Sequence, residues 1–299
     1  MKSELPITHI AFSDESHWNE GRHRSISLIT MPSRFNTKHK QTVRGFLDEV
    51  GISEFKWANL SGVRERKAAL KMCDFIVDTA SKGLLQLDVL IWDIEDSRHK
   101  IPGRDDIANL QLMYYKLFKH VLINGWPDGS AWILYPDEHS AMDWDNVKDH
   151  LDKVDTKIEI YQNLFTGGKF KLRLIREFKI YKINPLSSAC NPWLQIADLF
   201  AGLAVFSREH YSTYKQWQLE QEKQKGQLFL FESEPDTKIS RSSRERCYVL
   251  DYFYKLCRSK KLGVSLNTNK GLRTYNNKKP INFWFYTPQH PNDKAPSKK

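Results

Sequence analysis

The chain has 299 residues, 40% of them hydrophobic and 27% charged, which is ordinary for a globular protein with a full core, and its net charge of +10 favours polyanionic partners. No stretch approaches the ~18 apolar residues that a membrane-spanning helix needs, and the polar start is unlike a signal peptide, so we expect a cytoplasmic protein. Four scattered cysteines without C-x-x-C or paired Cys/His spacing argue against a zinc site or a disulfide framework and favour reduced thiols.

The hydrophobic periodicity predicts alternating strands and helices over the first two thirds of the chain. In chain order it predicts a strand at 7–14, its antiparallel partner at 25–31, a helix at 37–50, a short extended piece at 54–57, a helix at 64–82, a strand at 85–93, a helix at 105–124, a strand at 131–137, a helix at 144–154, one or two strands at 169–183 and a helix at 191–210. This order indicates an α/β domain over residues 1–210, a mixed sheet flanked by helices.

The last third departs from this pattern. Residues 211–243 are rich in Gln, Glu, Lys and Ser and indicate an exposed helix that passes into an insertion or linker. Residues 244–258 again have helical periodicity, and 281–286 form an aromatic strand. We therefore expect a C-terminal helix-plus-strand extension over 244–290, followed by a disordered tail at 291–299.

Several carboxylates stand where functional sites are built in α/β proteins. Asp14, Asp93 and Asp137 each end a hydrophobic strand, and strand ends are where such proteins place their sites. Asp198 lies in a helix that is apolar almost all round, where Gln195, Asp198 and Gly202 form one narrow polar or small stripe. An ionised carboxylate is costly there unless a cation or strong donors compensate it.

Carboxylates that converge from strand ends and a helix favour hard divalent cations. Oxygen ligands of this kind suit Mg²⁺ or Mn²⁺, and two such ions stabilise the attacking water and the leaving oxygen in phosphodiester cleavage. Any single strand-end aspartate can equally be a cap or a salt-bridge partner, so the interpretation depends on the set.

The order of these motifs resembles the family known as domain of unknown function 3800. The similar segments are Phe12-Ser13-Asp14-Glu15-Ser16, Glu54-Phe55-Lys56-Trp57, the strand that ends in Asp137-Glu138, and Leu194-Gln195-Ile196-Ala197-Asp198-Leu199. The resemblance extends over nearly the whole chain. It implies an RNase H-like fold and a metal-dependent nuclease of the kind found in bacterial phage-defence or mobile-element settings.

Residue by residue, the resemblance implies catalytic and metal-binding roles for Asp14, Glu54, Asp137 and Asp198. It also implies supporting positions for Lys56 and Gln195. We expect Lys56 to take part in catalysis by steadying a phosphate or a carboxylate, and Glu15 to support the site. Whether Asp93 or Asp137 supplies the second strand ligand stays open, because the strand beside the first should carry it and the sequence does not fix that neighbour. His17 stands where the family usually has glycine, so we expect a different shape in the first turn.

A short apolar cluster interrupts the polar linker. Gln227, Leu228, Leu230 and Phe231 belong to Gln227-Leu228-Phe229-Leu230-Phe231, which resembles the peptide by which bacterial replication and repair proteins bind the sliding clamp. A short extended peptide with hydrophobic anchors and polar flanks suits such docking. A local strand packed on the domain is the alternative.

The basic charge is concentrated at the C-terminal end. Residues 238–299 hold 15 Lys and Arg against 3 Asp and Glu, whereas residues 1–237 hold 31 against 33. Basic side chains there can follow a phosphate backbone while neighbouring aromatics are buried or stack on bases. The predicted nucleic-acid contacts are Lys260, Lys261, Lys270, Arg273, Lys278 and Lys279.

The sequence therefore predicts a metal-dependent nuclease acting on DNA or RNA, with two Mg²⁺ or Mn²⁺ ions, in phage defence or DNA repair. The alternative is a non-catalytic nucleic-acid-binding adaptor on the same fold that recruits a partner such as the sliding clamp. Acid–base chemistry on a small molecule is less favoured, because no phosphate-cradling glycine loop or nucleophile motif is present.

Overall fold

The computed structural model describes residues 6–17, 21–95, 105–153, 178–224 and 239–287 with their side chains, and residues 156–162 and 170–176 by their backbone. In this part of the chain the central sheet has six strands in the order β10-β3-β2-β1-β4-β7. The strands are β1 (His9–Ser16), β2 (His23–Pro32), β3 (Gln86–Asp93), β4 (Ser130–Pro136), β7 (Phe178–Ile183) and β10 (Ile281–Phe285).

All strands of this sheet run in the same direction except β2. β1 is antiparallel to β2 and parallel to β4, and β7 is parallel to β4. On the other side, β3 is antiparallel to β2 and parallel to β10. The carboxyl ends of β1, β3 and β4 therefore meet at one edge of the sheet, as the strand-end argument requires.

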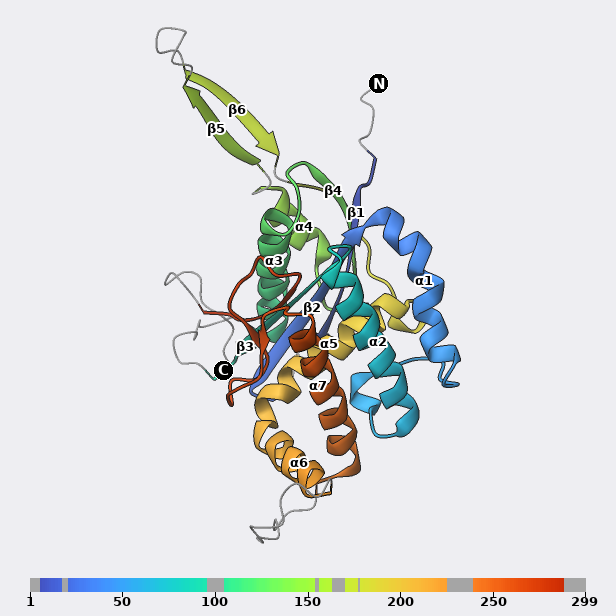
Figure 1. The fold of residues 1–299 in the computed structure, drawn as a ribbon. Coiled ribbons are helices and arrows are strands. Elements are labelled where there is room, and N and C mark those ends of the chain that lie inside the picture. Colours follow the sequence, from blue (N-terminus) through green and yellow to red (C-terminus); the bar gives the residue numbers. More distant parts are fainter. Residues whose placement is uncertain are drawn as a thin grey trace.

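Helices cover both faces of the sheet, so the molecule has three layers (Figure 1). The helices of one face are α1 (Ser33–Asp48), α2 (Val63–Ser81), α5 (Pro192–Glu209) and α7 (Arg241–Ser259). Those of the other face are α3 (Asp106–Asn124) and α4 (Trp144–Asp152). Period-two alternation sends Phe12 to the first core and Ala11 to the second. The mixed α/β sheet flanked by helices is thus confirmed.

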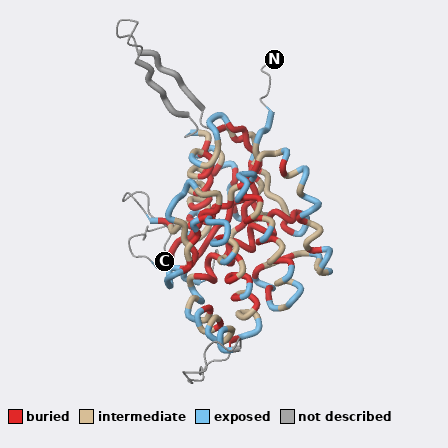
Figure 2. Tube along the Cα trace, in the orientation of Figure 1, coloured by how far each residue is buried: buried red, intermediate tan, exposed pale blue. Residues whose placement is uncertain are grey.

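Helix α5 is the central helix of its layer. Every residue from 192 to 207 is buried, and the helix packs across β1, β2 and β3 (Figure 2). The Asn191 side chain accepts a hydrogen bond from the Trp193 N–H at 3.1 Å, and Pro192 occupies the first turn, which is the predicted helix start. A helix apolar all round is thus explained by burial on all sides.

The C-terminal third completes the same core. Strand β10 pairs with β3 in the main sheet, and α7 packs on α2. Helix α6 (Tyr211–Gln224), in the stretch predicted as an exposed helix leading into a linker, adds Tyr214 and Trp217 to the core cluster. Helix α7 begins at Arg241, inside the predicted linker. The predicted boundary at residue 210 therefore does not separate two cores.

Strands β5 (Thr156–Gln162), β8 (Val264–Ser265) and β9 (Arg273–Thr274) were not predicted from the sequence. The hairpin of β5 and β6 (Phe170–Arg176) is a separate two-stranded sheet, and β8 pairs with β9. Only the second strand of the hairpin was predicted, as part of 169–183. None of the helices that the structure describes combines the length and apolar character needed to cross a membrane.

All four cysteines are free, and Cys73, Cys247 and Cys257 are buried, while Cys190 is exposed. The buried thiols fill the core as small hydrophobic groups.

Candidate active site

Two of the predicted acids lie on neighbouring parallel strands. In the pairing of β1 with β4, Ser13 lies opposite Pro136, and the Asp137 N–H continues the ladder by donating to the Ser13 carbonyl at 2.8 Å. Asp14 is the next residue of β1, on the face covered by α5, and it is only 5% exposed. The sheet order thus brings Asp14 and Asp137 to the same edge, side by side.

The third acid, Asp198, reaches the site from helix α5 and holds a second chain segment there. Its Oδ2 accepts the Trp57 N–H at 2.6 Å, and Gln195 Oε1, one turn earlier, accepts the Phe55 N–H at 2.7 Å. At Gly202, one turn later, the Trp57 ring lies so close that a Cβ would stand 2.2 Å from it. The polar stripe of α5 therefore provides the hydrogen-bond acceptors that a neighbouring strand would otherwise offer to the backbone of residues 54–57.

This docking decides where Glu54 and Lys56 point. Phe55 and Trp57 are buried, whereas the side chains of Glu54 and Lys56 are about one third exposed, because alternate residues of extended chain face opposite ways. Lys56 Nζ lies 3.8 Å from Glu54 Oε1 and 3.8 Å from Asp137 Oδ2. The lysine thus stands between carboxylates from different elements.

Ser188, which the sequence analysis missed, links the parts of the site. Its hydroxyl donates to Glu54 Oε1 at 2.9 Å and its N–H donates to Asp137 Oδ1 at 2.9 Å. Its carbonyl accepts the Gln195 side-chain N–H at 2.8 Å. Two adjacent serines before Asn191 gave no signal of this role, since Ser-rich stretches before a helix are common caps and turns.

The electrostatics of the cluster are those of crowded negative charge. Burial, and then the charges of Asp198, Glu15 and Asp137, raise the pKa of Asp14 well above its usual range. Burial raises the pKa of Asp198 to about 6 and also raises that of Asp137. The single positive charge of Lys56 therefore does not balance the negative charge of the carboxylates around it.

Lys56 is affected in the opposite sense. Burial by itself lowers the pKa of this ammonium, but the charges of Asp14, Asp198, Asp137 and Glu54 outweigh it and raise the pKa above its usual value. The lysine stays charged because all four predicted acids surround it. This common neighbour shows that Asp14, Glu54, Asp137 and Asp198 form one cluster, here called the acid cluster.

Glu15 stands beside the acid cluster on the other face of the sheet. Its side chain points toward α3, where the Tyr114 hydroxyl donates to its Oε2. Burial raises the pKa of Glu15 to about 7. Glu15 can therefore support the cluster by its charge, whereas its hydrogen bond belongs to the α3 layer.

Asp93 is not part of the acid cluster. It ends β3 opposite His23 of β2, four residues beyond Ser27, which is the β2 residue opposite Asp14. The Arg22 guanidinium donates to both of its oxygens, at 2.8 to 3.1 Å. Against the effect of burial, this bond lowers the pKa of Asp93. Of the two acids left open by the sequence, the structure places Asp137 in the cluster.

His17 has a φ of 60°, in the left-handed region that favours glycine. A glycine takes this backbone conformation readily and a histidine rarely does, and the expected difference from the family in the shape of the first turn stays a prediction.

The basic residues predicted to hold nucleic acid do not gather at the acid cluster. Lys278 and Lys279 precede β10, and strands β10 and β1 both run toward the acid edge, so these lysines lie at the opposite edge of the sheet. Lys279 Nζ donates to the Lys261 carbonyl at 3.4 Å, and Lys260 Nζ lies 3.7 Å from Asp78 Oδ1 near the end of α2. These four lysines thus share the far edge.

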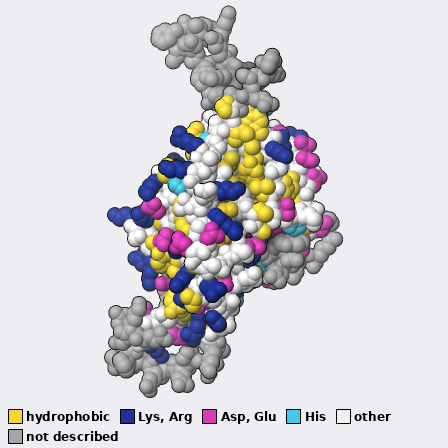
Figure 3. Space-filling view, turned by 90° about the vertical axis from the view of Figure 1, so that its right-hand side faces the viewer, with side chains coloured by type: hydrophobic (Ala, Val, Ile, Leu, Met, Phe, Trp, Pro, Cys, Tyr) yellow, Lys and Arg dark blue, Asp and Glu magenta, His cyan; other side chains and the backbone are white. Residues whose placement is uncertain are grey.

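Lys270 and Arg273 lie elsewhere. The Lys270 carbonyl accepts from Arg208 Nη1 at 3.0 Å, near the C-terminal end of α5, and the Arg273 guanidinium lies 5.3 Å from the Tyr275 ring centre. On the α1 and α2 side of the molecule, acidic and basic side chains are mixed around a band of hydrophobic ones (Figure 3). The concentration of positive charge in the C-terminal part of the sequence therefore does not by itself indicate a continuous basic surface for nucleic acid.

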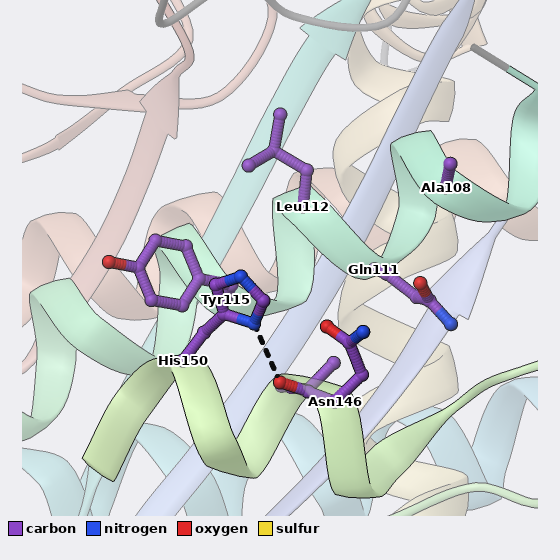
Figure 4. Close-up of a pocket in the computed structure, with 7 residues that line it drawn as sticks. Ala108, Gln111, Leu112, Tyr115, Asn146 and His150 are labelled. Carbon is purple, nitrogen blue, oxygen red and sulfur yellow. Dashed lines mark hydrogen bonds between the residues drawn. The ribbon is translucent and has the colours of Figure 1, made fainter. Parts of the chain in front are cut away.

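A separate surface cavity of about 260 Å³ lies between α3 and α4. Figure 4 shows Leu112, Tyr115 and His150 at this cavity, with His150 Nδ1 donating to the Asn146 carbonyl at 2.8 Å. These helices cover the face of the sheet opposite α5. The cavity is therefore separate from the acid cluster.

The donor chemistry of the acid cluster fits divalent cations. Asp14, Glu54, Asp137 and Asp198 offer hard oxygen ligands and carry more negative charge than Lys56 balances, which is what Mg²⁺ or Mn²⁺ requires. As the side chains stand, no three His, Cys, Asp or Glu groups of the described residues are close enough to hold an ion. The Lys56 ammonium stands among them instead. Ion binding thus requires side-chain movement, in which the one-third-exposed Lys56 would turn outward.

The clamp-like segment with Gln227, Leu228, Leu230 and Phe231 lies outside the described residues.

Comparison with known proteins finds close relatives in an archaeon. The chain is 39% identical over 293 residues to Uncharacterized protein ORF2' of Methanothermobacter thermautotrophicus, covering 95% of this chain and 96% of that protein. It is 38% identical over 295 residues to Uncharacterized protein ORF2 of the same organism, covering 96% and 97%. No family model matches the chain, so its resemblance to domain of unknown function 3800 stays a prediction.

Proposed function

We propose that this chain, which belongs to the same protein family as ORF2 and ORF2' of Methanothermobacter thermautotrophicus, is a metal-dependent nuclease that hydrolyses phosphodiester bonds of DNA or RNA. The observation that carries the proposal is the acid cluster. Four carboxylates from separate elements meet around Lys56, and α5 holds the segment that bears two of these five groups. Such an arrangement is costly for folding and is expected where function requires it.

The sheet supports an RNase H-like fold within this proposal. In that fold the strand beside the first should supply the second acid, and here the neighbour of β1 that ends in an acid of the cluster is β4, with Asp137. The antiparallel β2 and the helix that delivers Asp198 agree with the motif order of domain of unknown function 3800. We propose membership of that family on these grounds.

Each residue then has a stated task. Asp14, Glu54, Asp137 and Asp198 would hold the ions, and bound Mg²⁺ or Mn²⁺ would supply a positive centre that favours both the attacking water and the leaving oxygen. Ser188 and Gln195 fix the orientations of Glu54 and of the 54–57 segment. Lys56, displaced outward by the ions, would place its ammonium on a phosphate oxygen of the substrate.

The test is a cleavage assay with defined substrates. The protein is incubated with labelled single- and double-stranded DNA and RNA in Mg²⁺, Mn²⁺ or EDTA, beside Asp14→Asn and Asp198→Asn. Cleavage that needs the metal and is lost in both variants supports the nuclease. Binding without cleavage in every condition would instead support a non-catalytic adaptor that recruits a partner such as the sliding clamp, and would overturn the nuclease.

A further inference from the structure

Arg246 of α7 lies against the segment that carries Glu54 and Lys56. Its Nη2 donates to the Trp57 carbonyl at 3.3 Å and to the Ala58 carbonyl at 3.0 Å. Its guanidinium also lies 5.4 Å from the centre of the Trp57 ring. Both hydrogen bonds use Nη2, and within the described residues the buried Nε has no acceptor. The side chain is thus held in place, and Nη1 is the donor left for a ligand from outside.

Among the residues with described side chains, Arg246 lacks the counter-ion that Arg24 and Arg66 have. Arg24 pairs with Asp106 at 2.9 Å, and Arg66 pairs with Glu245 at 2.8 Å. In the described part of the chain no carboxylate lies within ion-pair distance of Arg246, although the side chain is half-buried, and burial lowers its pKa. A cation taken partly out of water without a partner is costly, so the position calls for an anion.

The position of Arg246 relative to the acid cluster identifies that anion. Trp57 accepts from Arg246 through its carbonyl and donates to Asp198 through its N–H, so the backbone of one residue separates the guanidinium from the cluster. A guanidinium offers several donors in a planar fork that suits phosphate oxygens. We propose that Arg246 binds a backbone phosphate of the nucleic acid next to the one held at the acid cluster.

This inference rests on the proposed nuclease function. In it Arg246, and not the lysines at the far edge of the sheet, is the main contact for the nucleic-acid backbone. Arg246 and Lys260 are 14 residues apart on and just beyond one helix, roughly 21 Å along its axis, which leaves Arg246 near the acids and Lys260 away from them. A nucleic-acid strand that crosses the acid cluster toward α7 reaches Arg246 before Lys260.

The test is a binding titration by fluorescence anisotropy, with a fluorescein-labelled single-stranded DNA 20-mer and the matching RNA, in EDTA so that no cleavage occurs. Arg246→Gln is compared with Arg244→Gln, a matched change on the same helix at an arginine that Glu220 already neutralises at 3.1 Å. Arg246→Gln should weaken binding about tenfold and lower the slope of log Kd against log salt by about 0.7. Arg244→Gln should change neither value.

Thermal unfolding separates a binding defect from a folding defect, and Arg246→Lys, which keeps the charge, should restore the salt slope. Equal affinities and slopes for Arg246→Gln and the unaltered protein would overturn the inference, as would equal losses in Arg246→Gln and Arg244→Gln. If the unaltered protein binds neither strand in EDTA, the phosphate contact at Arg246 is overturned, whereas the nuclease function is decided separately by metal-dependent cleavage. A defect confined to Arg246→Gln leaves that function intact and supports the phosphate contact.

Discussion

Replacing Gly202 by alanine tests whether the close approach of Trp57 to α5 builds the acid cluster. The new Cβ would stand 2.2 Å from Cγ and Cδ1 of the Trp57 ring, a separation that real Cβ atoms essentially never show. The ring and its backbone must therefore shift. Such a shift disturbs the 2.6 Å hydrogen bond from the Trp57 N–H to Asp198, and with it the positions of Glu54 and Lys56.

The magnitude follows from two opposing effects. Overpacking of a filled core costs about 1–3 kcal/mol, whereas alanine in place of glycine inside a helix contributes about 1 kcal/mol of stability. Gly202→Ala should thus destabilise the fold by up to about 2 kcal/mol. Gly45→Ala is the matched control, because Gly45 lies inside α1 with no atom within 4 Å of its added Cβ, and it should stabilise by about 1 kcal/mol.

The assay is thermal unfolding of both variants, followed by cleavage at a temperature where both are folded. We expect a lower Tm for Gly202→Ala and a higher one for Gly45→Ala, with a shift of roughly 2–4 °C per kcal/mol. Cleavage should fall in Gly202→Ala alone. If Gly202→Ala raises Tm as much as Gly45→Ala and cleaves normally, the packing argument is refuted.

Two further predictions concern buried polar groups. Asp88 Oδ2 and Asn282 Oδ1 are buried without a donor in the described residues. Burial raises the pKa of Asp88 to about 7 because the folded protein favours the protonated carboxyl. The stability that depends on the protonated Asp88 is therefore fully present below about pH 4 and is lost as the pH rises to about 7. Asp88→Asn should therefore leave chemical denaturation near pH 4 unchanged and be more stable than the unaltered protein at pH 8; parallel pH profiles would contradict this. Ser188→Ala removes the donor to Glu54 and should cost about 1–2 kcal/mol and lower the cleavage rate, which unfolding and kinetic measurements check; an unchanged rate would contradict the role of Ser188.

The elements of the main sheet could be predicted because each is encoded locally. The alternation of Ile10, Phe12 and Asp14 marks one strand face, and Asn191-Pro192 marks the start of α5. Asp198 stood out because a carboxylate in an apolar helix needs compensation. These arguments need no knowledge of which element lies beside which.

The missing parts depend on neighbours far away in the chain. The choice between Asp93 and Asp137 follows from strand order, which periodicity does not encode. Ser188 binds Glu54 across 134 positions, so no local pattern signals it. The charge at Lys278 and Lys279 was visible, but its distance from the acid cluster follows from the parallel pairing of β10 with β3.

The most direct test of the central claim is the single-turnover cleavage rate of Asp137→Asn beside Asp93→Asn, in Mg²⁺ and in Mn²⁺. Both acids end strands at the same edge of the sheet, but only Asp137 contacts Lys56 and Ser188. The acid cluster predicts at least about a hundredfold loss in Asp137→Asn and a rate close to that of the unaltered protein in Asp93→Asn. Cleavage that survives Asp137→Asn, or that is lost equally in both variants, would contradict it.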